Sequence, residues 1–74
     1  KFRKTLLAQT SENTLISIMQ KIPSDIELSS LPIFKEGKPS VELSLSYKVE
    51  SVLEKYFSFF TNELKILNIP YKIY

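Results

Sequence analysis

The stretch that most constrains the fold is the nineteen-residue segment from Val49 to Leu67, which contains neither glycine nor proline. Its apolar residues recur at spacings of three and four, the period of an amphipathic α-helix. At about 100° per residue these side chains cover roughly half of the helix circumference, whereas a surface helix needs a stripe of only about 100°. The excess is a flank formed by Val52, Phe59 and Ile66. We therefore expect this helix to cover its own sheet and a second surface.

The clearest strand lies just before this helix. From Val41 to Lys48 apolar and polar residues alternate without exception. Such alternation predicts a strand with one face buried and the other in water. The preceding Glu36-Gly37-Lys38 is the expected hairpin turn, with Gly37 as the position of positive φ.

Two further strands are predicted at Phe2–Ala8 and from Ile26 to Leu31. In the first, Lys4 interrupts an otherwise apolar face. The second runs into Pro32, which lacks the N–H that a central strand donates. We therefore expect this segment either to lie at a sheet edge or to break at the proline.

A short helix is predicted between the first two strands. Thr10 or Ser11 offers a hydroxyl to cap it, Glu12 puts an acid in its first turn, and Pro23 ends it. Its apolar residues form one narrow stripe: Leu15, Ile18, Met19 and Ile22.

The resulting order, β-α-β-β-α, predicts a single α+β domain over residues 1–74. We expect a two-layer sandwich in which two helices cover one face of a three-stranded antiparallel sheet. The last four residues, Tyr71–Tyr74, are expected as a short extended tail. Such a sheet has two exposed edges, which a small domain must protect or use.

Composition argues against an enzyme. The chain has no Cys, no His and a single Asp, Asp25. Disulfides and the usual zinc sites are excluded, and no glycine loop for phosphate is present. We expect no catalytic residue, cofactor or metal. No apolar run is long enough to cross a bilayer, and the absence of Cys fits a reducing compartment, so a cytoplasmic location is expected.

Size favours association with another protein. A core in a chain of 74 residues rarely supplies more than about 3–5 kcal/mol without help from oligomerisation or cross-links. The expected partner interface is the flank of Val52, Phe59 and Ile66. Glu63 lies inside the same apolar arc and either pairs with a partner's Lys or Arg at the rim or bends out to water.

A nucleic-acid-binding domain is the alternative. Lys1, Arg3 and Lys4 form the one basic cluster of a chain whose net charge is +2, and such a cluster can contact phosphate. A regulatory dimerisation domain from a larger protein is a third hypothesis.

A family resemblance adds to these patterns. The strand, short helix, hairpin turning at Glu36-Gly37-Lys38, alternating strand and long C-terminal helix resemble the Pcc-type small subunits of KEOPS. KEOPS is the complex that installs threonylcarbamoyl on adenosine in tRNAs. The resemblance covers nearly the whole chain and rests on element order and length. It implies a dimerising accessory subunit that is not catalytic.

The last helix departs from the conventional member. That member tends to carry an Arg and, four residues later, an Asn, in a pattern like L-R-x-x-x-N-S-x-L. Aligning Leu53 with the first Leu puts Glu54 at the Arg and Ser58 at the Asn. The chain is therefore more similar to a diverged paralogue that forms a heterodimer with a Pcc-type subunit, with a homodimer left open. Contact with tRNA would then be indirect.

Overall fold

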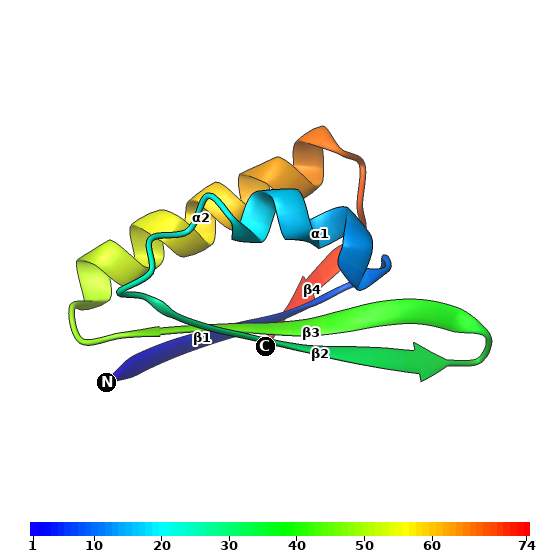
Figure 1. Cartoon of the computed structure of the whole chain (residues 1–74), viewed down its shortest axis with the longest axis horizontal. Helices are drawn as coiled ribbons and strands as arrows, with labels where there is room; N and C mark the ends of the chain where they lie inside the picture. Colours follow the sequence, from blue (N-terminus) through cyan, green and yellow to red (C-terminus); the bar gives the residue numbers. More distant parts are fainter.

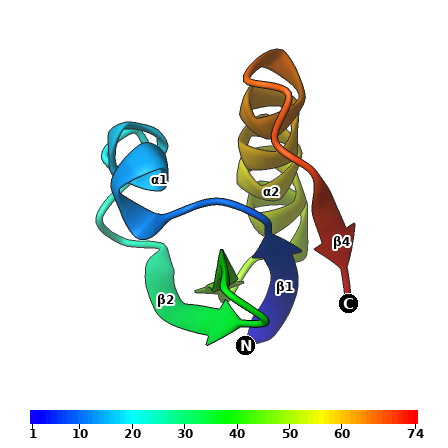
Figure 2. The ribbon, with the colours of Figure 1, turned by 90° about the vertical axis from the view of Figure 1, so that its right-hand side faces the viewer.

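The computed structural model describes residues 1–74, apart from the side chain of Lys35. The chain forms two helices and four strands, in the order β1 (Phe2–Ala8), α1 (Glu12–Met19), β2 (Glu27–Lys35), β3 (Lys38–Tyr47), α2 (Glu50–Ile66) and β4 (Tyr71–Ile73). All strand pairs are antiparallel, and the sheet order is β2-β3-β1-β4. Both helices lie on one face of the sheet (Figures 1 and 2). The α+β class is confirmed.

The fourth strand corrects the expected three-stranded sheet. β4 pairs with β1 through Leu6 opposite Ile73 and Ala8 opposite Tyr71. A helix-ending motif redirects the chain toward this edge. Asn68 has a φ of 57°, and the Ile69 N–H donates to the Leu64 carbonyl, which is the bonding of a Schellman cap. The three residues of β4 are too few to show a period, so the sequence pattern did not separate them from a tail.

The core lies between the sheet and the helices. The alternation in β3 places Val41, Leu43 and Leu45 on the helix-facing side, where all three are fully buried. The opposite, helix-free side is named here the open face. At its centre Ser44 is only 5% exposed, and its hydroxyl lies 2.9 Å from that of Thr5. The open face is therefore drier at its centre than alternation alone predicts.

The β2–β3 hairpin extends beyond the helix layer (Figure 1). Gly37 has a φ of 75°, as predicted, and Glu36 also has a positive φ, of 54°. Positive φ at both central residues is the type I′ arrangement, whose twist matches that of the strands. Pro32 lies within β2, which is an edge strand, so the edge alternative is confirmed.

The helices begin where expected and end earlier. Ser11 takes the N-cap position of α1, but its hydroxyl makes no capping bond to the backbone and instead lies 3.3 Å from the hydroxyl of Thr14. α1 ends at Met19, and the buried Ile22 follows in a turn. On α2 four side chains are buried against the sheet: Leu53, Phe57, Phe60 and Leu64.

Candidate partner interface

The three residues of the expected interface flank on α2 differ in how much of each is buried within the chain. Val52 and Phe59 are half-buried and pack against the hydrophobic core of the same chain. Ile66, the third member, has 65% of its surface exposed. Part of the wide apolar arc is therefore covered within the chain, and its C-terminal end is the part left open to a partner.

Glu63 forms an ion pair inside the chain. Its Oε1 accepts a hydrogen bond from Nζ of Lys21 at 3.1 Å, and its side chain is 21% exposed. Lys21 follows α1, so the pair joins the C-terminal end of that helix to α2. A basic residue of a partner would have to replace Lys21 to reach this carboxylate.

Exposed apolar residues lie both at the end of α2 and in and after β4. Ile66 and Leu67 at the end of the helix are exposed, and so are Ile73 and Tyr74 at the end of the chain. The connecting segment descends from the end of α2 to the outer edge of the sheet, where β4 lies beside β1 (Figure 2). Sequence reasoning missed Ile73 and Tyr74, because it assigned them to a tail rather than to an edge strand.

The three basic residues of the alternative site do not share one surface. Arg3 and Lys4 are consecutive in β1 and therefore point to opposite faces of the sheet. Nζ of Lys4 lies 4.0 Å from Oε1 of Glu54 and 5.7 Å from the ring centre of Phe57. These contacts explain why a lysine is tolerated in the apolar row of β1, because its charge reaches the polar side of α2.

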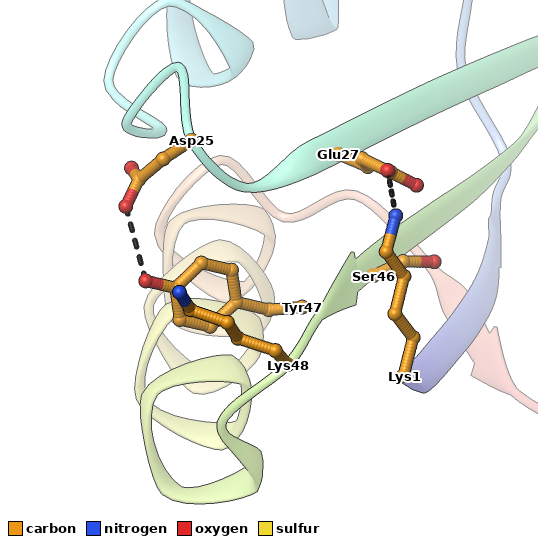
Figure 3. Close-up of a pocket in the computed structure, with 6 residues that line it drawn as sticks. All are labelled: Lys1, Asp25, Glu27, Ser46, Tyr47 and Lys48. Atoms are coloured by element: carbon orange, nitrogen blue, oxygen red, sulfur yellow. Dashed lines mark hydrogen bonds and ion pairs between the residues drawn. The ribbon is translucent and has the colours of Figure 1, made fainter.

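Lys1 is likewise paired, at a pocket of about 230 Å³ at the start of β1 (Figure 3). The Lys1 ammonium donates a hydrogen bond to Glu27, and this bond together with the positive charge lowers the pKa of that carboxyl below 4.5. Across the pocket the Tyr47 hydroxyl donates to Oδ2 of Asp25 at 3.1 Å. That bond and the negative charge raise the pKa of Tyr47 above 10.0.

Each carboxylate of the pocket thus has a partner within the chain, Lys1 for Glu27 and Tyr47 for Asp25. Within the described part of the chain, no three or more Asp or Glu side chains gather as a potential metal site. Neither helix described here is long and apolar enough to span a membrane.

Comparison with known proteins adds no relative: no family model matches the chain, and neither curated proteins nor solved structures give a significant match.

Proposed function

We propose that this chain is a non-catalytic accessory subunit that acts by binding another protein. The observation that carries the proposal is the exposed C-terminal end of α2. Ile66 continues the apolar line of Val52 and Phe59, yet 65% of its surface is open to solvent. Leu67 is also exposed beside it in the sequence. Two large apolar side chains exposed at adjacent positions favour a contact with another protein.

The proposed partner is a Pcc-type small subunit of KEOPS, with this chain as the diverged member of a heterodimer. The observed order of strands and helices up to α2 supports this proposal. Glu54 stands where the conventional member tends to have Arg, and it lies near Lys4 of its own chain. The missing Arg argues against docking on the catalytic subunit in the conventional way and leaves pairing as the proposed role.

The proposal is tested by co-purification with a Pcc-type subunit from the same cell. The chain carries an affinity tag, and the partner is identified and quantified after size-exclusion chromatography. Ile66→Asp should weaken the complex by about 2 kcal/mol or more, the scale of an interface hot spot. Because Ile66 is largely exposed, the folding midpoint of the Ile66→Asp variant should change little.

Ile16→Asp is the matched control. Ile16 lies on α1 and is 42% exposed, so the Ile16→Asp substitution introduces the same charge on the other helix. The control should retain the complex. Equal loss in both variants would show that added charge, not the end of α2, is responsible. A stable monomer that binds no Pcc-type subunit, and instead binds tRNA at physiological salt, would favour the nucleic-acid alternative.

A further inference from the structure

The two edges of the sheet differ in the backbone groups they present. In the β2–β3 hairpin, Lys35 and Lys38 are register partners on either side of the two-residue turn, and in such a hairpin the two flanking residues form a hydrogen-bonded pair. Hydrogen-bonded pairs alternate along an antiparallel ladder, so the backbone of every second residue of β2, counted from Lys35, points toward β3. Pro32 falls among the outward-pointing residues. The β2 edge therefore lacks a donor in its middle and is a poor template for another strand.

The β4 edge has no such interruption. The Gln9 N–H donates to the Pro70 carbonyl at 2.8 Å, and the Tyr74 N–H donates to the Thr5 carbonyl at 3.1 Å. The alternation between these two bonds directs the backbone of Lys72 inward, toward β1. The N–H and C=O groups of Tyr71 and Ile73 consequently point outward. This edge offers two donors and two acceptors in the spacing of a regular strand.

Charge on the open face also differs between the two edges. The registers place Arg3 of β1 and Lys72 of β4 on this face, with the acidic Glu27 and Glu42 on β2 and β3. Lys72 is separated from Glu42 in its row by Leu7. The open face therefore carries a lysine at the β4 edge, whereas the Glu27 carboxylate at the β2 edge is already paired with Lys1.

We propose that β4 pairs with an extended strand of a different protein, which presents a carboxylate opposite Lys72 and apolar residues on either side. One of these apolar residues would cover the exposed Ile73 on the helix-facing side of the sheet. A second copy of this chain fits poorly in the register that pairs all three residues of β4. Antiparallel pairing of Tyr71 with the copy's Ile73 sets two Lys72 side chains directly opposite each other, where like charges destabilise a sheet. The inference rests on the proposed function and names the edge and the chemistry of the partner.

A charge-swap mixture tests the edge with this chain as its own probe. When the wild type is mixed with the Lys72→Glu variant, Lys72 of one chain faces the introduced carboxylate of the other. The dissociation constant of the mixed pair should be roughly tenfold lower than that of either chain pairing with itself, because a like-charge pair is exchanged for an opposite-charge pair. Sedimentation equilibrium and chemical-shift perturbation measure this preference, which should shrink in 1 M salt because screening is then strong (a Debye length of about 3 Å).

Lys38→Glu is the matched control, since it changes the net charge equally at the hairpin, away from β4. A mixture of wild type with Lys38→Glu should show no such preference. The inference is overturned if the two mixtures behave alike, or if neither shows association specific to β4.

Proline variants test the direction of the backbone groups. Ile73→Pro removes an outward donor and keeps the inward bonds of β4, so it should abolish mixed pairing with the Lys72→Glu chain. Phe34→Pro removes an outward donor from the β2 edge and should retain the pairing. Pairing that survives Ile73→Pro would overturn the inference. If the Ile73→Pro variant does not fold, the charge-swap mixture still tests whether β4 pairs with another strand.

The two proposals fail separately. In one outcome the chain binds a Pcc-type subunit, Ile66→Asp abolishes that complex, and the charge-swap mixture shows no preference. This result would refute pairing through the β4 edge and would leave the proposed function standing. Mixed pairing through β4 without any Pcc-type complex would refute that partner and leave the edge.

Discussion

Replacing each of two neighbouring phenylalanines by alanine separates core from interface on α2. Phe60 is fully buried, and Phe59 is half-buried against the same core. Phe→Ala in a core costs about 3–5 kcal/mol. A core in a domain of 74 residues rarely supplies more than about 3–5 kcal/mol. Phe60→Ala should therefore remove a large part of the total and leave a substantial unfolded fraction.

Phe59→Ala should cost about half as much. Its ring loses only part of its solvent contact on folding, and the free energy of burial follows the apolar area removed from water. We expect about 1.5–2.5 kcal/mol by halving the full core cost. If Phe59 also contacts the partner, this variant should weaken association by about 2 kcal/mol or more per folded molecule.

Urea unfolding followed by circular dichroism measures the first quantity. With a slope of about 1 kcal/mol per molar urea for a domain of this size, the two variants should differ in midpoint by more than 1 M. The second quantity is the partner's dissociation constant, corrected for the folded fraction. Equal destabilisation of both variants, with unchanged affinity per folded molecule, would refute the reasoning and make Phe59 a core residue only.

Three further predictions concern the turn and the pocket. Glu36→Asn should raise the free energy of unfolding by up to about 1 kcal/mol, because asparagine tolerates the positive φ of a type I′ turn; the shift of the midpoint in thermal melts measures this gain. The pKa of Glu27, followed by NMR, should lie below 4.5 and should rise in the Lys1→Ala variant. Because folding lowers this pKa, the ion pair stabilises the fold above pH 4.5, and this stabilisation is lost as the pH falls through the pKa of the folded state. Folding raises the pKa of Tyr47, so its contribution is present below pH 10 and lost as pH rises further. Tyr47→Phe should flatten that alkaline loss in urea midpoints measured from pH 9 to 11.

The sequence predicted the elements whose patterns are long and regular. Eight alternating residues fixed the faces of β3, and Gly37 marked the turn, because only glycine takes a positive φ without strain. β4 was missed because three residues carry no period. The positive φ of Glu36 was missed because glutamate gives no local sign of it, and the turn type is set by the twist of the strands that it joins.

The candidate site was harder to predict than the fold, because its residues meet across the chain. The pair between Lys21 and Glu63 joins positions 42 residues apart, and helical periodicity shows only that Glu63 lies in an apolar arc. The direction of the β4 backbone depends on its register with β1, which a single strand does not specify. Sequence reasoning identified the excess apolar surface of α2, but it could not say which part the same chain covers.

The two polar residues that interrupt apolar patterns indicate where α2 remains free. Lys4 interrupts the inner row of β1 and reaches Glu54 and Phe57 on one side of α2. Glu63 interrupts the apolar arc of α2 and reaches Lys21 beside the other helix. Each charge thus ties α2 to a neighbouring element of its own chain, one on each side. A partner that docked along either side would have to displace one of these pairs, whereas the end of the helix and the β4 edge can be covered without breaking an ion pair found among the described residues. This is the physical reason why we propose the C-terminal end of the molecule as the surface that binds a partner.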